Sequence, residues 1–158
     1  MAVDVQNHKA VCFGGPAIAS SAATSSSYVD TRGWDYAAID VVINPAATTS
    51  ASAKWLSLEL GESADTNISN ATAISGCTGT TNATATATQF VLPVHNDAVY
   101  GGIIRFYVDC RTKERYLHVT KKCPDASHLT TFNYATLTRG DVAPNTTTEA
   151  GVQAYVFV

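Results

Sequence analysis

The chain has 158 residues, enough for one domain with a sizeable hydrophobic core. Hydrophobic residues make up 46% of it but charged residues only 15%, against roughly 25% in a typical globular protein. The formal net charge of -3 argues against a nucleic-acid-binding domain, which ordinarily carries a basic patch. Thr, Ser, Ala and Asn replace the missing charges, a composition common in extracellular and viral β proteins.

The first 27 residues differ in character from the rest. A short apolar run, Ala10 to Phe13, precedes Gly14-Gly15-Pro16, and a tract rich in Ser and Ala follows. The run predicts a short edge strand, whereas the tract is typical of an extended arm on a neighbour or of a mobile terminus. We therefore expect an N-terminal arm or edge segment over residues 1–27 and a β-sandwich domain over residues 28–158.

The sequence contains no recognisable targeting or membrane segment. Its beginning, MAVDVQNHKAVCFGG, lacks a basic region followed by a long apolar run, so it does not resemble a secretory signal. No stretch approaches the roughly 18 apolar residues of a membrane span. We expect synthesis in a cytosol and no membrane partner.

Two strands are predicted in the first half of the sandwich domain. Trp34 to Asn44 carries apolar residues on both faces, which is typical of a central strand, and Pro45 ends it. Lys54 to Leu60 alternates leucines with more polar residues, which indicates a strand with one buried face. Alternation is weak from Thr66 to Ile74, and Ser75 to Gly79 interrupts it.

The segment from Tyr100 to Cys123 organises the second half. Ile103 to Cys110 and Arg115 to Thr120 each alternate apolar with polar side chains, and the polar tetrapeptide Arg111 to Glu114 lies between them. This pattern predicts a β-hairpin with a charged tip. The remaining chain is expected to add strands around this hairpin.

Two more strands are predicted towards the C-terminus, Leu129 to Thr138 and Val152 to Val158. The second, VQAYVFV, is apolar enough that we expect a sheet to hold it. No convincing helix is present. The sequence thus predicts an all-β protein: an antiparallel, jelly-roll-like β-sandwich of about 8–10 short strands.

The four cysteines are Cys12, Cys77, Cys110 and Cys123. In the predicted hairpin, Cys110 lies near the tip and Cys123 near the far end, separated by about eight residues at ~3.3 Å each. A disulfide between them would conflict with that hairpin. We expect reduced, mostly buried thiols, and no zinc site because no CxxC spacing occurs.

No catalytic motif is found. The nucleophile elbow GxSxG and both glycine-rich phosphate loops are absent. Glu59 and Glu62 do not form a convincing acid pair, and Arg139-Gly140-Asp141, the integrin-recognition tripeptide, is explained by a turn. Four aromatic residues either fill the core or stack on sugars: Trp34, Trp55, Tyr107 and Tyr116. We expect no enzyme, cofactor or metal.

Three short segments follow one another in a recognisable order: DTRGWD (30–35), LELGESAD (58–65) and RYLHV (115–119). They are similar to a "DTKGYD"-like start, to a "LQESDD"-like stretch from whose pattern Gly61 departs, and to a "KRYVR"-like strand. Together they resemble small tailed-phage head proteins of the capsid decoration or cement type. The similarity spans about residues 28–140.

The resemblance implies a virion structural protein on the outside of the phage head, made in the host cytoplasm, without enzymatic activity or cofactor. Its partner would be the major capsid protein, with no nucleic acid and no membrane involved. Such proteins commonly form symmetric homo-oligomers, and by analogy we favour a trimer.

The implied mechanism is stapling, in which each subunit bridges capsomers. We expect partner binding by the N-terminal segment, through strand addition to a partner's sheet edge. The candidate partner-binding residues are Ala10, Val11, Cys12, Phe13, Pro16 and Ile18. The alternatives are a carbohydrate- or receptor-binding β module of a phage fibre or tail, and another tail or neck structural component. A deep pocket holding a base and a nucleophile would instead favour an enzyme.

Overall fold

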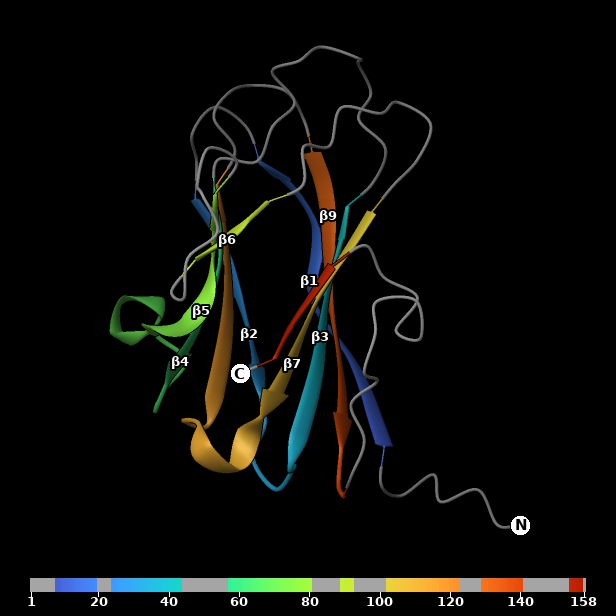
Figure 1. The fold of residues 1–158 in the computed structure, drawn as a ribbon, viewed down its shortest axis with the longest axis vertical. Helices are drawn as coiled ribbons and strands as arrows, with labels where there is room; N and C mark the ends of the chain where they lie inside the picture. The colour runs from blue at the N-terminus through green and yellow to red at the C-terminus, as the bar shows by residue number, and fades with distance from the viewer. Residues whose placement is uncertain are drawn as a thin grey trace, which may run out of the picture.

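A computed structural model describes residues 8–19, 24–43, 57–80, 89–92, 102–122, 129–140 and 154–157. These residues form ten β-strands in two five-stranded sheets. The sheets pack face to face, with sheet A on the right and sheet B on the left of Figure 1. The predicted all-β sandwich is therefore confirmed.

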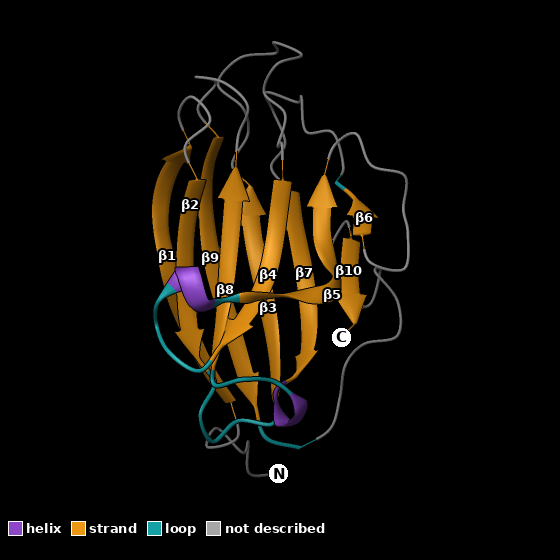
Figure 2. Ribbon diagram, turned by 90° about the vertical axis from the view of Figure 1, so that its left-hand side faces the viewer, coloured by secondary structure: helices purple, strands orange, loops and turns teal. Residues whose placement is uncertain are grey.

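The two sheets draw their strands from the whole length of the chain (Figure 2). Sheet A has the order β1 (His8–Ala19), β9 (Leu129–Thr138), β3 (Tyr36–Ile43), β7 (Gly102–Asp109) and β10 (Ala154–Phe157). Sheet B has the order β2 (Thr24–Asp30), β8 (Tyr116–Lys122), β4 (Ser57–Ser63), β5 (Thr72–Thr80) and β6 (Gln89–Val91). Two short 3-10 turns complete the described elements, η2 (Ile68–Asn70) and η3 (Cys110–Thr112).

Most neighbouring strands are antiparallel, but one edge strand of each sheet is not. β10 pairs in parallel with β7, and β6 pairs in parallel with β5. β3 lies in the middle of sheet A between β9 and β7, as its two apolar faces predicted. The described part of the predicted C-terminal strand, β10, is held in sheet A as expected.

The core lies between the sheets and is built from the inward-facing residues of most strands. Phe106 on β7 is fully buried and meets the ring of Phe90 from β6 edge-on, with 5.8 Å between ring centroids. The other buried apolar side chains include Ile39, Val41, Leu58, Leu60, Ile74, Leu92, Ile104, Val108, Leu117, Val119, Ala135 and Leu137. Strands β2, β3, β4, β5, β7, β8 and β9 each contribute at least one of these residues or Val29 to the fully buried core.

The predicted β-hairpin is wrong. β7 pairs with β3 and β10 in sheet A, whereas β8 pairs with β2 and β4 in sheet B. Between them the Asp109 carboxylate accepts the N–H of Arg111, and the N–H of Lys113 donates to the Cys110 carbonyl. This turn and the residues after it carry the chain across the roughly 10 Å between packed sheets. Strand alternation is identical for a hairpin and for such a crossing, so the sequence pattern could not separate them.

Three of the four cysteines lie in the described residues, and they agree with the prediction of reduced, mostly buried thiols. Cys77 and Cys110 are free and buried, and burial raises the pKa of each thiol to about 12. Cys12 is free and exposed. Cys123 lies outside the described residues.

The predicted break at Ser75 to Gly79 is also wrong, because β5 runs through it. Gly76 has a φ of +83°, a conformation that favours glycine, and it lies where the pairing of β4 with β5 shifts register. The glycine therefore permits an irregularity within the strand. Cys77 beyond it points into the core.

The aromatic ring of Phe90 packs directly against the backbone of Gly79. A Cβ at residue 79 would lie 2.4 Å from the Phe90 ring, so Gly79→Ala must displace that ring from Phe106. We expect a loss of about 1–3 kcal/mol in unfolding free energy, measured by urea denaturation. In the Phe90→Ala background the same substitution should cost at least about 1 kcal/mol less, whereas additive effects would contradict this packing.

Candidate functional site: the outer face of sheet A

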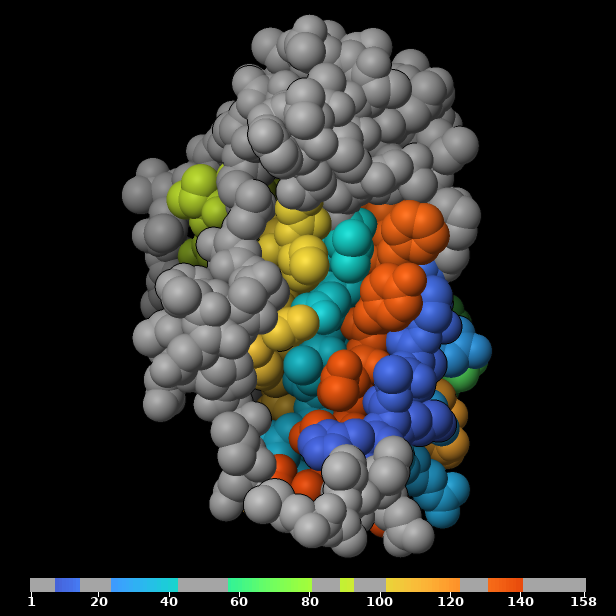
Figure 3. Space-filling view, turned by 90° about the vertical axis from the view of Figure 1, so that its right-hand side faces the viewer, coloured from blue at the N-terminus to red at the C-terminus, as the bar shows by residue number. Residues whose placement is uncertain are grey.

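The outward side chains of sheet A form a continuous surface, which we call the outer A face. Strand register places Asp40 of β3 between Arg105 of β7 and Tyr134 of β9. The alternating residues on the same side define the face: Ala10, Cys12, Ala38, Asp40, Val42, Ile103, Arg105, Tyr107, Phe132, Tyr134 and Thr136. Figure 3 shows β1, β9, β3 and β7 side by side on this side of the molecule.

Apolar side chains dominate part of the outer A face. Val42 lies opposite Ile103 on one side and Phe132 on the other, and all three are only half-buried. Tyr134 lies beside them and is 43% exposed. In a sandwich the outward residues are normally polar. This row therefore offers aromatic and aliphatic surface of the kind that protein partners cover.

An ion pair lies next to the apolar row. The Arg105 guanidinium donates two hydrogen bonds to the Asp40 carboxylate, one of them 2.6 Å long between Nη2 and Oδ2. The two side chains are 23% and 15% exposed, and Arg105 also donates to the Tyr107 hydroxyl at 3.3 Å. The carboxylate raises the pKa of Arg105. The charges are thus satisfied within the sheet, which lowers the cost of covering this face with a partner.

The outward face of sheet B, the outer B face, has a different character. Small or charged polar residues cover most of it: Thr24, Ser26, Ser57, Glu59, Thr78, Thr80, Thr120 and Lys122. Tyr28 is 44% exposed and meets the Tyr116 ring edge-on, with 5.8 Å between centroids. The two faces of the sandwich are therefore chemically unequal, and the apolar row belongs to sheet A.

The predicted partner-binding residues all lie in β1, the outermost strand of sheet A. Ala10 and Cys12 are exposed, whereas Val11 and Phe13 pack against the core. Pro16 and Ile18 belong to the strand, and Ile18 pairs with Thr130, but their side chains lie outside the described residues. Two of the six side chains are therefore exposed, and two pack against the core.

The N-terminal segment proposed as an arm or edge segment contributes strands to both sheets. β1 pairs with β9 along its length, with register shifts around Gly14. Residue 27, where the segment was expected to end, falls within β2. The edge strand predicted over Ala10–Phe13 is present, and it is longer than predicted, since β1 spans His8–Ala19.

A buried histidine was not anticipated from the sequence. His118 is 1% exposed, and its Nε2 lies 2.7 Å from the hydroxyl of Ser63, itself 2% exposed. Its Nδ1 has no hydrogen-bond partner among the described residues. Since both side chains are closed to solvent, this Ser–His contact ties β4 to β8 and is out of reach of a substrate.

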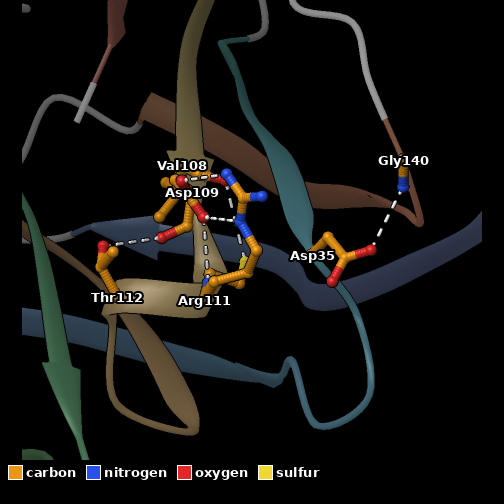
Figure 4. Close-up of polar contacts among 7 residues, drawn as sticks. Asp35, Val108, Asp109, Arg111, Thr112 and Gly140 are labelled. Atoms are coloured by element: carbon orange, nitrogen blue, oxygen red, sulfur yellow. Dashed lines mark hydrogen bonds and ion pairs between the residues drawn. The ribbon is translucent and has the colours of Figure 1, made fainter.

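The Arg-Gly-Asp tripeptide lies in a loop cluster at one end of the sandwich. Arg139 donates to the Gly33 carbonyl at 2.9 Å and stacks over Trp34 at 5.0 Å, and the Gly140 N–H donates to Asp35 at 3.2 Å. Figure 4 shows this last bond beside the Asp109–Arg111 pair. The arginine is therefore engaged within the chain; Asp141 lies outside the described residues.

Of the other aromatics considered, Trp34 is partly buried against the core, Tyr107 is 9% exposed and Trp55 lies outside the described residues.

An open polar depression of about 480 Å³ lies near the C-terminal end of β4. It is lined by Glu62, Asn70, Thr72, Thr112, Lys113 and Glu114. No group of three potential metal ligands occurs in the part of the chain that the structure describes. Across the same described ranges, no helix has the length and apolar character needed to cross a membrane.

Comparison with known proteins adds no assignment. No protein-family model matches the chain, and no curated protein matches its sequence.

Proposed function

We propose that this protein is a virion structural protein of a tailed phage, which binds the outside of the head and stabilises it by bridging capsomers. The observation that carries the proposal is the inequality of the two sandwich faces. A half-buried apolar row and an exposed tyrosine lie on the outer A face, while small polar residues cover most of the outer B face. A decoration protein needs one adhesive face and one face that tolerates solvent.

The composition of the outer A face supports a protein partner. Interface centres are enriched in aromatic residues and arginine and poor in unpaired charges. Tyr134 and Phe132 supply the aromatic surface, and the Arg105 charge is already paired with Asp40. A capsid surface covering this face would bury apolar area without leaving that charge unmatched.

The strand order supports the jelly-roll part of the prediction. Without β6 and β10, the sheets have the orders β1-β9-β3-β7 and β2-β8-β4-β5. Successive strands β1 to β4 alternate between the sheets, as do β7 to β9. Eight strands in two sheets with this alternation fit the jelly roll, an architecture that viral capsid proteins and lectins both use. The topology agrees with the proposal without selecting between those two functions.

The β1 edge gives a second means of attachment. Among the described strands β1 pairs with β9 alone, so its other edge can accept a strand from a partner. The exposed Ala10 and Cys12 side chains lie where that edge meets the outer A face. We therefore place the contact with the major capsid protein on this face and edge.

The proposed stapling relies on several modest contacts. Contacts of micromolar strength contribute roughly 8 kcal/mol each and become durable when several engage together. A symmetric homo-oligomer, of which we favour a trimer, would present several outer A faces to neighbouring capsomers at once. Heads carrying the protein should then withstand higher temperature or lower salt than bare heads.

The test is binding to capsids assembled from the major capsid protein encoded in the same genome. Purified chain is mixed with these capsids, the capsids are sedimented, and the bound copies are counted. We expect saturation at a fixed copy number set by the capsid lattice. Absence of binding, or a few copies per particle, would contradict decoration.

A receptor- or carbohydrate-binding module of a fibre or tail is the second candidate. The observation in its favour is the exposed Tyr28, which with Tyr116 forms an aromatic pair on the outer B face. Aromatic pairs of this kind can stack on sugars. Binding of the chain to host-surface glycans, lost in Tyr28→Ser, would support this candidate in place of decoration.

A further inference from the structure

A buried polar cluster joins the two sheets near the β1 and β2 edges. Lys121 of β8 and Asn133 of β9 are 3% and 0% exposed. The Lys121 ammonium donates to the Thr131 hydroxyl at 2.6 Å and to the Asn133 side-chain oxygen at 3.0 Å. The Asn133 amide nitrogen donates to the Ser27 hydroxyl at 2.5 Å. The side chain of Lys121 from sheet B thus contacts the carboxamide of Asn133 from sheet A inside the sandwich.

The surroundings of Lys121 make its charged form less stable than it is in water. Both acceptors of Lys121 are neutral, and burial lowers its pKa to about 8. About a tenth of the molecules therefore carry a free amine at this position at neutral pH. A free amine is a nucleophile, and the carbon of the Asn133 carboxamide is one bond beyond the oxygen that Lys121 contacts.

The site is also tightly closed around the carboxamide. A Cβ at residue 14 would lie 2.8 Å from the Asn133 amide nitrogen and 3.0 Å from the Ser27 hydroxyl, so only glycine fits on β1 here. Close packing and burial keep bulk water from the carboxamide. Hydrolysis to aspartate is thereby disfavoured relative to attack by the neighbouring amine.

We propose that Lys121 and Asn133 form an intramolecular isopeptide bond that links the two sheets. The Lys121 nitrogen attacks the carboxamide carbon, a new C–N bond forms, and the bond from that carbon to the Asn133 amide nitrogen breaks. The amine loses one proton to the departing nitrogen, which leaves as ammonia, so no oxidant or other reagent is needed. The Thr131 hydroxyl contacts the attacking nitrogen and the Ser27 hydroxyl contacts the leaving nitrogen, so each nitrogen has a neighbouring group that can accept or donate a proton.

The expected consequence is a covalent tie across the core. β8 and β9 lie in different sheets, so the bond would oppose separation of the two layers. The inference rests on the buried cluster alone and is independent of the proposed function. A cross-linked sandwich would suit any protein that must resist mechanical or thermal stress.

The test is the intact mass of the purified, reduced and denatured full-length chain after incubation at neutral pH. We expect a mass about 17 Da below that of the sequence, which corresponds to one lost ammonia. Digestion with trypsin should then yield a branched peptide that joins residues 116–122 to residues 123–139. A wild-type chain that keeps its full mass would overturn the proposal. Because this measurement uses the wild-type chain, it does not depend on the folding of any variant.

Two variants separate the isopeptide from other losses of ammonia. Lys121→Arg keeps a cation but removes the amine nucleophile, so its mass should equal that of its sequence. Lys122→Arg changes the adjacent, only partly buried lysine and should retain the loss. Cyclisation of Asn133 onto its own backbone would also release ammonia but would persist in Lys121→Arg, and that result would contradict the proposal.

Discussion

Tyr134→Ser should remove most of the binding to capsids while leaving the fold intact. Tyr134 is the most exposed large side chain of the outer A face, at 43%, and it adjoins the Asp40–Arg105 pair. A tyrosine at the centre of an interface commonly contributes about 2 kcal/mol or more, equivalent to roughly 30-fold in affinity. Because several subunits bind together, the loss in capsid occupancy should be larger still. Co-sedimentation with capsids over a range of concentrations measures it.

Tyr28→Ser is the matched control. Tyr28 is 44% exposed, carries the same side chain and lies on the outer B face. We expect this variant to decorate capsids as the wild type does, and both variants should unfold within about 1 kcal/mol of it. An equal loss of capsid binding in both variants, or a loss only in Tyr28→Ser, would contradict the assignment of the adhesive surface to sheet A.

Phe106→Ala should be the most destabilising substitution in the core. Phe106 is fully buried on β7 and lies edge-on to Phe90 of β6, so its removal leaves a cavity between the sheets. Such truncations cost about 3–5 kcal/mol, a large share of the stability of a domain of this size. Urea denaturation should show a lower midpoint with an unchanged slope.

Two comparisons make the Phe106 result specific. Phe106→Leu keeps most of the apolar volume and should cost clearly less than Phe106→Ala. Val91→Ala alters a side chain that is 46% exposed on the edge strand β6 and should change the free energy of unfolding by about 0.5 kcal/mol or less. A Phe106→Ala cost near that of Val91→Ala would contradict the placement of the core.

Much of the fold could be predicted from alternation, because which face of a strand is buried is a local property of the sequence. Trp34 to Asn44 was identified as a central strand, and β3 occupies that position. Sheet membership is not local, since β7 and β8 show the same pattern in a hairpin as in a crossing between sheets. Their separation depends on the turn at η3 and on partners far away in the chain.

The candidate site could be predicted less well, because its residues meet only through strand pairing. Asp40 and Arg105 are 65 positions apart, and no sequence pattern predicts their contact. Lys121 did carry a signal, since it continues the inward alternation of Leu117 and Val119. Because lysines are rarely fully buried, this alternation alone does not predict a place for Lys121 in the core. The apolar run from Ala10 to Phe13 predicted the edge strand β1, but the division of its side chains between core and surface needed the register with β9.

The most direct test of the central proposal is cryo-electron microscopy of capsids mixed with the purified chain. We expect density repeating at icosahedrally related positions on the head exterior, with the outer A face and the β1 edge against the capsid and the outer B face towards solvent. Density confined to the tail or neck, or copies docked through the outer B face, would contradict it.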